Sequence, residues 1–253
     1  MKKRIKKVLA VIGIILLLFI ILVGYLVYKD LKQEDVLKKE VINLSNKDLL
    51  EDNFNIDIKT TGDYAYVENA IKKYYKELSD NVKKLNYALD NEELLNILST
   101  DTLQSDRPSF TNSRNTIKNV KKTSTESLQK IATLCDEEYI KNLLDKEKVS
   151  DYYIDFYKKI MYTEKDIKTL IKTKEEMEEI SNSLNEFLDK VEEILSMLER
   201  NNSAWYIEDK QIYFETEEQV NEYNKLYEEL KGIANDKLGS KKYVKSIDED
   251  ISI

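Results

Sequence analysis

The sequence contains no histidine, and histidine is both the most common general base and the most common nitrogen ligand for metals. Catalytic triads that need histidine and histidine-ligated metal centres are therefore excluded. Paired acidic residues such as Glu92 and Glu93 are adjacent rather than one helical turn apart, which is typical of a solvated helix surface. The sequence predicts a protein that is not an enzyme, with no cofactor and no bound metal.

Cysteine, proline and glycine are scarce, with one, one and five residues among 253. The single cysteine, Cys135, excludes a disulfide bond within the chain, and its place on an apolar helical stripe predicts a small buried residue. Because proline and glycine interrupt helices, their scarcity predicts an all-α fold. Such a fold must be held by packing, and apolar residues make up 42% of the chain.

Arginine is also rare, since only four of the 40 basic residues are arginine: Arg4, Arg107, Arg114 and Arg200. Arginine is the side chain that best recognises phosphates and base edges, and the chain has a net charge of −8. Nucleic acid is therefore not an expected partner. The excess of lysine, isoleucine and asparagine over arginine, proline and alanine is typical of an AT-rich genome and indicates a low-GC bacterium.

The longest apolar run, Val8 to Tyr28, has no charged residue. As a helix it would reach about 30 Å, the thickness of a bilayer's hydrocarbon core. Residues 1–7 hold five positive charges, and positive flanks stay cytoplasmic. We expect a cytoplasmic basic tail over 1–7, a single transmembrane signal-anchor helix over 8–28, and the bulk of the chain outside the cell membrane. A cleaved signal peptide is the alternative, but its apolar region would be shorter and an Ala-x-Ala site would follow.

The part of the chain beyond the anchor is expected to be acidic and helical, because it carries 35 basic against 48 acidic residues. Residues 29–62 are expected to form a juxtamembrane stalk helix and loop. Residues 63–238 are expected to form an elongated antiparallel helical bundle, followed by a flexible tail over 239–253.

Apolar residues at three- and four-residue steps predict three long helical stretches in the bundle. The first runs over 63–99, the second over 112–143, and the third over 151–200 with a joint at 162–163. The polar residues 99–113, which include the only proline, are expected to form the main loop between the first two.

The second half of the third stretch has the clearest periodicity of the chain. Its apolar residues alternate steps of three and four, as in the heptad seam of a coiled coil. An intramolecular bundle and a coiled-coil dimer predict the same seam, and we favour the intramolecular bundle because the other amphipathic helices need partners. The seam comprises Met177, Ile180, Leu184, Phe187, Val191, Ile194 and Leu198.

Residues 205–214 read as a small β-hairpin, with two apolar runs around a polar four-residue turn. A last helix follows to Gly232, and Thr216 and Gln219 have the spacing of a capping box at its start. Aromatic side chains gather here, and those with polar tips suit binding surfaces. The candidate interaction patch comprises Trp205, Tyr206, Tyr213, Phe214, Tyr223 and Tyr227.

A second candidate surface is the polar segment Asp101 to Ser113, where Arg107 and Pro108 lie among hydroxyl groups. The anchor, the long heptad helix and the lack of catalytic residues together favour a non-enzymatic interaction or scaffold protein of the bacterial cell envelope. Its expected partners are the membrane and either another protein or further copies of the chain. The alternative is a module that binds cell-wall glycan or a small ligand through the aromatic patch around Trp205.

Overall fold

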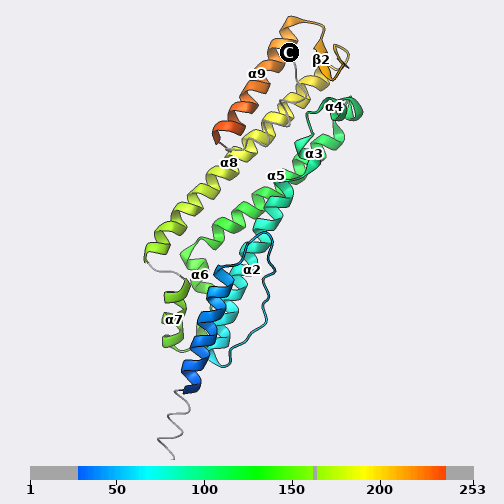
Figure 1. Ribbon diagram of the computed structural model, residues 1–253. Coiled ribbons are helices and arrows are strands. Elements are labelled where there is room, and N and C mark those ends of the chain that lie inside the picture. The colour runs from blue at the N-terminus through cyan, green and yellow to red at the C-terminus, as the bar shows by residue number, and fades with distance from the viewer. Residues whose placement is uncertain (1–27, 162–163, 238–253) are drawn as a thin grey trace, which may run out of the picture. The chain divides into compact units, whose positions relative to one another are not determined.

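The computed structural model describes residues 28–161 and 164–237, which are predominantly helical (Figure 1). The predicted helical bundle is confirmed, and so is the small antiparallel sheet near the C-terminus. The predicted membrane-spanning helix lies outside the described residues except for Tyr28, and the predicted tail lies outside them entirely. Within the two described ranges, no helix is both long enough and apolar enough to cross a bilayer.

Apart from the segment over residues 46–62, the described elements follow one another with short connections. In chain order they are a helix over residues 28–45, α2 (Asp63–Leu89), α3 (Glu92–Leu95), α4 (Thr100–Asp106), α5 (Thr111–Leu134), α6 (Glu137–Leu143), the 3₁₀-helix η1 (Lys146–Lys148), α7 (Asp151–Met161), α8 (Glu164–Arg200), β1 (Trp205–Glu208), β2 (Gln211–Phe214), α9 (Glu217–Gly232) and the π-helical turn η2 (Ile233–Lys237).

The chain divides into two compact units. In the described chain, unit 1 holds residues 28–76 and 141–161, and unit 2 holds residues 77–140 and 164–237. The helix of the predicted stalk ends at residue 45, and the segment up to the start of α2 is irregular. Leu37, Leu44 and Phe54 from this predicted stalk are buried, so the segment contributes to the core of unit 1.

Unit 1 contains a buried ion pair between Glu68 and Lys72, one turn apart on α2. Lys72 Nζ lies 2.6 Å from Glu68 Oε1 and 3.2 Å from Glu40 Oε2. The other Glu68 oxygen accepts hydrogen bonds from the backbone N–H of Thr60, at 2.8 Å, and from its hydroxyl, at 2.7 Å. Burial raises the pKa of Glu68, but hydrogen bonds from Lys72 and Thr60 outweigh it and hold the pKa below its ordinary value of 4.5. The network therefore fixes the irregular segment to α2.

Aromatic side chains complete unit 1. The ring of Tyr64 on α2 meets the rings of Tyr153 and Phe156 on α7 edge to face, with centroid distances of 4.8 and 5.8 Å. The Tyr153 hydroxyl donates to Asp30 Oδ1 at 3.3 Å. Burial, reinforced by the Asp30 charge, raises the pKa of Tyr153 to about 12. These contacts join the helix over residues 28–45, α2 and α7 in one layer of side chains.

Unit 2 has a mainly aliphatic core, in which α8 packs along both α5 and α9. The second predicted helix was expected to continue to residue 143, and this is wrong, because α5 ends at Leu134 and α6 begins at Glu137. The physical reason is Asp136, whose Oδ1 accepts the backbone N–H groups of Glu138 and Tyr139 at 2.9 and 3.2 Å and so starts a new helix. Cys135 at this break is buried as predicted, and burial raises its pKa.

The segment 99–113 was expected to be a loop, and this is wrong as well, because α4 occupies residues 100–106 and α5 begins at Thr111. The hydroxyl of Ser99 caps α4 by accepting the Thr102 N–H at 3.3 Å, while Leu103 packs into the core. Phe110 precedes α5 in the left-handed conformation, with φ of 50°, which is uncommon for a large side chain. Its complete burial in the core holds it there.

Candidate functional site

The C-terminal hairpin is built as the sequence predicts, except for the length of its turn. β1 and β2 pair antiparallel with Trp205 opposite Phe214 and Glu208 opposite Gln211. The turn has two residues rather than four, because Asp209 and Lys210 both adopt positive φ, at 50° and 61°. Two residues with positive φ match the twist of paired strands. Each strand is therefore one residue longer than predicted, and Glu208 pairs with Gln211.

Trp205 anchors the hairpin to unit 2 and is only 2% exposed. Its indole N–H donates to the carbonyl oxygen of Leu198 at 2.8 Å, and its ring stacks on Phe110 with centroids 6.4 Å apart. The guanidinium of Arg107 lies 4.1 Å from the ring centroid, and its Nε donates to Asn202 Oδ1 at 3.1 Å. This cation–π contact covers the indole from the α4–α5 connection. Trp205 is thus part of the core and is not available to a ligand.

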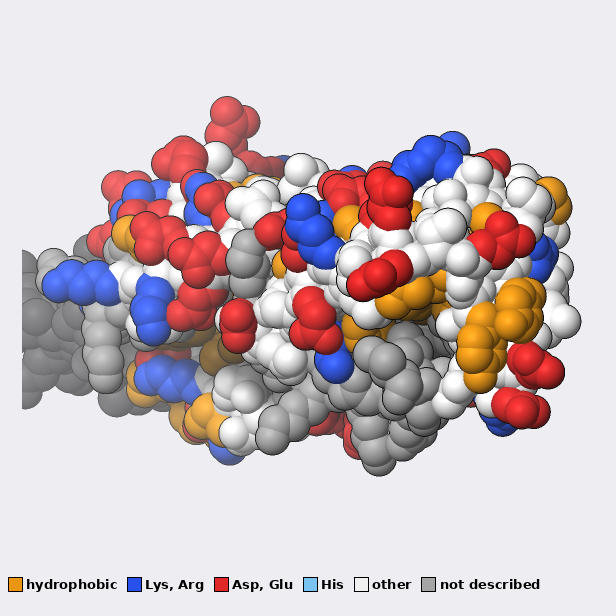
Figure 2. All heavy atoms as spheres, turned by 90° about the horizontal axis from the view of Figure 1, so that it is seen from above, with side chains coloured by type: hydrophobic (Ala, Val, Ile, Leu, Met, Phe, Trp, Pro, Cys, Tyr) orange, Lys and Arg blue, Asp and Glu red, His pale blue; other side chains and the backbone are white. Residues whose placement is uncertain are grey.

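The opposite face of the hairpin carries an exposed aromatic pair. Tyr206 and Tyr213 are direct cross-strand neighbours, and their rings stack with centroids 5.3 Å apart and an interplanar angle of 14°. Tyr206 is 51% exposed and Tyr213 is 38% exposed. Figure 2 looks onto the end of unit 2 that carries the hairpin and shows hydrophobic side chains gathered between charged ones. We call the side chains of Tyr206 and Tyr213 the tyrosine face.

The remaining members of the predicted patch point inward. Phe214 packs against the core, and its ring lies 5.3 Å from that of Tyr223 on α9. Tyr223 and Tyr227 are both buried. The Tyr223 hydroxyl has no hydrogen-bond partner among the described residues, and burial raises its pKa. The predicted patch therefore divides into four core residues, counting Trp205, and the two residues of the tyrosine face.

The residues of the predicted heptad seam lie at different depths. Leu184, Phe187, Val191, Ile194 and Leu198 are buried within this one chain, and Met177 is partly buried against the same core. Ile180 is 37% exposed. Most of the seam is thus already covered by α5 and α9, which leaves little of it for a second copy of the chain.

The capping box of α9 is present and supports the hairpin. Thr216 Oγ1 accepts the Gln219 N–H at 3.3 Å, and Gln219 Oε1 accepts the Thr216 N–H at 3.3 Å. The Gln219 amide also donates to Asn201 Oδ1 at 3.2 Å. These bonds fix the chain direction where β2 passes into α9.

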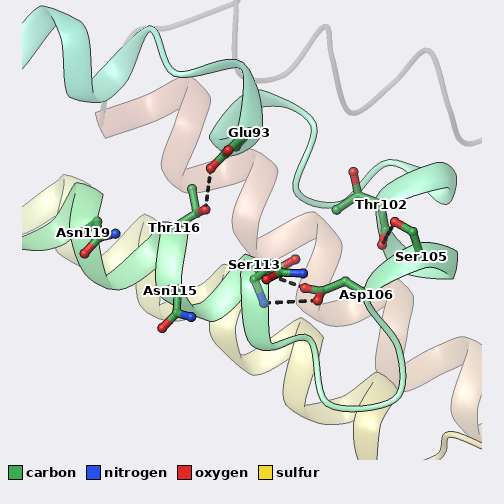
Figure 3. Close-up of a pocket in the computed structure, with 9 residues that line it drawn as sticks. Glu93, Thr102, Ser105, Asp106, Ser113, Asn115, Thr116 and Asn119 are labelled. Carbon is green, nitrogen blue, oxygen red and sulfur yellow. Dashed lines mark hydrogen bonds between the residues drawn. The ribbon is translucent and has the colours of Figure 1, made fainter.

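A polar pocket of about 470 Å³ lies among α3, α4 and α5 in unit 2 (Figure 3). All nine residues that line it are serine, threonine, asparagine, aspartate or glutamate. The sequence singled out Asp101 to Ser113 as a surface, but Glu93 and the α5 residues Asn115 and Asn119 were missed. Asn115 and Asn119 are one turn apart on α5, but the sequence alone does not show that α4 lies opposite them.

Asp106 is the pocket carboxylate that is fixed by backbone hydrogen bonds. It accepts the backbone N–H groups of Asn112 and Ser113 at 3.1 and 2.7 Å, and so caps the start of α5. Burial raises the pKa of Asp106, but the hydrogen bonds from Ser113 and Asn112 outweigh it and hold the pKa below 3.8. The carboxylate is therefore ionised at neutral pH and balances the positive end of the α5 dipole.

The described residues contain no cluster of three or more acidic or cysteine side chains that could hold a metal ion. Comparison with protein-family models, curated proteins and solved structures finds no match to this chain. The functional argument therefore rests on the sequence and on the two surfaces just described, the tyrosine face and the polar pocket.

Proposed function

We propose that the chain is a single-pass membrane protein of the bacterial cell envelope, which holds a non-enzymatic helical module outside the membrane to bind another protein. The apolar run Val8 to Tyr28 and the five positive charges before it support the anchor and its orientation. The acidic, helix-rich composition of the rest supports an extracytoplasmic bundle. The single observation that carries the interaction role is the tyrosine face.

The tyrosine face has the physical properties of a protein-binding surface. Tyrosine offers a large contact area and a polar tip with few rotatable bonds, so little entropy is lost when it binds. In Tyr206 and Tyr213 that loss is reduced further, because the rings already stack on each other. Trp205 fixes the strand beneath them. A rigid, exposed aromatic pair is the kind of anchor around which protein interfaces are built.

The alternative function, binding of cell-wall glycan through the aromatic patch, has less support. Its central residue, Trp205, is enclosed between Phe110 and Arg107. Only Tyr206 and Tyr213 remain to stack on a sugar ring. A fluorescence titration with soluble wall fragments separates the two functions, because a glycan module would give a saturable change that is lost in Tyr206→Ser.

Photo-crosslinking in native membranes tests the proposed role. A photo-crosslinking amino acid replaces Tyr206 in the full chain, and the matched control carries it in place of Tyr87, a tyrosine that is 81% exposed. We expect a discrete adduct with another protein from position 206 and none from position 87. Tyr213→Ser should weaken that adduct, because it removes half of the tyrosine face. The same adducts from both positions, or none from position 206, would contradict the proposed surface.

Protease treatment of intact spheroplasts tests the orientation independently. The proposed topology predicts that the part of the chain after residue 28 is digested from outside. Protection of that part until the membrane is permeabilised would overturn the orientation without bearing on the tyrosine face.

A further inference from the structure

The polar pocket in unit 2 has the size of a small-molecule site. Its volume of about 470 Å³ falls within the usual range for ligand pockets, about 300 to 1,000 Å³. Glu93 lies on one side, Thr102 and Asp106 on another, and Asn115 and Asn119 on a third (Figure 3). Most ligand pockets are largely apolar, whereas this lining contains no aliphatic or aromatic residue. The ligand it fits is therefore hydrophilic.

The charges of the pocket exclude an anion and disfavour a cation. The lining includes two carboxylates, Glu93 and Asp106, and neither lysine nor arginine. Both carboxylates already hold donors from the protein, since Glu93 Oε2 accepts the Thr116 hydroxyl at 2.9 Å and Asp106 accepts two backbone N–H groups. A cation would find much of their capacity already used.

The other lining groups are amides and hydroxyls, which both donate and accept hydrogen bonds. Asn115 and Asn119 are one helical turn apart on α5, so their amides share one face of the pocket. Alcohol groups of a ligand need both kinds of partner. The lining thus matches the hydroxyl groups of a neutral polyol better than it matches any ion.

Ser113 also lines the pocket, but it is only 4% exposed and its Oγ is fully buried. Figure 3 shows Ser113 and Asp106 facing each other at this side of the pocket. The Ser113 side chain is one of the groups that hold the pKa of Asp106 below 3.8. Ser113 therefore serves to keep Asp106 ionised, and the groups left for a ligand are the exposed amides and hydroxyls of the lining.

We propose that this pocket binds a small neutral polyhydroxylated molecule of the size of a mono- or disaccharide. Asn115 and Asn119 bind its hydroxyl groups on one side, and the hydroxyls of Thr102 and Ser105 bind them on another. This site is separate from the tyrosine face and does not depend on the proposed protein partner.

Isothermal titration calorimetry of the full chain tests the proposal. The protein is held in a detergent without a sugar headgroup, because a glucoside or maltoside detergent would compete. The probes are glucose, N-acetylglucosamine, maltose and myo-inositol, with choline chloride and inorganic phosphate as ionic comparisons. We expect saturable binding of at least one polyol and none of the two ions. Absence of binding by all four polyols, or binding of an ion alone, would overturn the proposal.

Three variants locate the binding. Ser105→Ala should weaken the polyol about 2- to 10-fold, the usual loss for one neutral hydrogen bond. The double variant Asn115→Leu/Asn119→Leu should weaken it at least about 10-fold, while leucine, a better helix former, keeps α5 folded. The matched control Asn221→Leu, at an exposed position of α9, should change the affinity less than about 2-fold.

Thermal melting of the variants without polyol separates a lost site from a lost fold. Ser105→Ala should melt close to the parent, because the position is exposed and alanine favours the helix. A polyol affinity that the double variant leaves unchanged would place binding elsewhere and overturn the assignment of this pocket.

Discussion

Units 1 and 2 are stabilised by different interactions. In unit 1 the charged pair Glu68 and Lys72 is fully enclosed. In unit 2 the centre is aliphatic, and completely buried residues such as Leu195 and Leu198 on α8 have no polar group to satisfy. Removing one partner of a buried charge pair destabilises the fold because it leaves an unpaired charge in the interior. Shortening a side chain in an aliphatic core destabilises the fold because it leaves a cavity.

The largest effect is expected from Lys72→Leu in unit 1. This change leaves the Glu68 and Glu40 carboxylates without their shared cation, and breaking a buried pair costs about 3 to 5 kcal/mol. Urea unfolding followed by far-UV circular dichroism measures the loss. The control is Lys38→Leu, which removes an exposed pair with Glu34 and should leave the unfolding midpoint nearly unchanged. Equal midpoints for the two variants would show that the buried pair contributes no more than a surface one.

A somewhat smaller loss is expected from Ile194→Ala in unit 2. Ile194 is completely buried, and removing three carbons from such a site costs about 2 to 4 kcal/mol. Ile180→Ala makes the same chemical change at another seam position, where the side chain is partly exposed, and should cost less than about 1 kcal/mol. Urea unfolding followed by the fluorescence of Trp205 measures both. Similar losses at the two positions would mean that α8 is covered more evenly than described.

Arg107→Ala should have a smaller effect again, about 1 to 2 kcal/mol. It removes the cation–π contact with Trp205 and the hydrogen bond to Asn202. Because water then reaches one side of the indole, we also expect the emission of Trp205 to shift to longer wavelength. Arg200→Ala, which removes an exposed pair with Glu222, is the control and should leave the spectrum unchanged. An unshifted spectrum in Arg107→Ala would mean that the guanidinium does not shield the ring.

The smallest effect is expected from mild acid. The pKa values of Glu68 and Glu40 in the folded chain lie below their ordinary value of 4.5, because the hydrogen bonds of Lys72, Thr60 and Lys59 outweigh the effect of burial. Groups of this kind add stability that is fully present above pH 4.5 and is lost as the pH falls through the lower folded values. The unfolding midpoint should therefore fall between about pH 5 and pH 3, and more steeply in the parent than in Lys72→Leu. Equal pH dependence in both would contradict the role of Lys72.

The sequence predicted the aliphatic core of unit 2 better than the ion-pair network of unit 1 for a physical reason. Aliphatic burial on a helix leaves a regular spacing, so α8, the bounds of α9 and the hairpin could be read from the order of residues. The buried network in unit 1 joins the Glu68–Lys72 pair on α2 to Glu40 and Thr60, which precede α2 and follow no period with it. Charged residues of this kind look like any solvated surface until the fold brings them together.

The candidate sites show the same limit. The sequence placed an aromatic patch around Trp205, but it could not tell which face of each strand is covered, because that depends on where Arg107 and Phe110 arrive. It also missed α4, since six polar residues with one buried leucine carry little helical signal. The sequence therefore singled out the segment 101–113 that forms one wall of the pocket, but only the structure shows the pocket itself.

Cys135 can report how often unit 2 opens locally. Thiol reagents attack the thiolate, and this sulfur is both enclosed and held largely in the protonated form at neutral pH. Alkylation of the native protein can then proceed only through transient opening at the junction of α5 and α6. Its rate, compared with that of the unfolded chain, reports how often this part of unit 2 opens under conditions where the protein is otherwise intact. With no second cysteine in the sequence, the signal belongs to that junction alone.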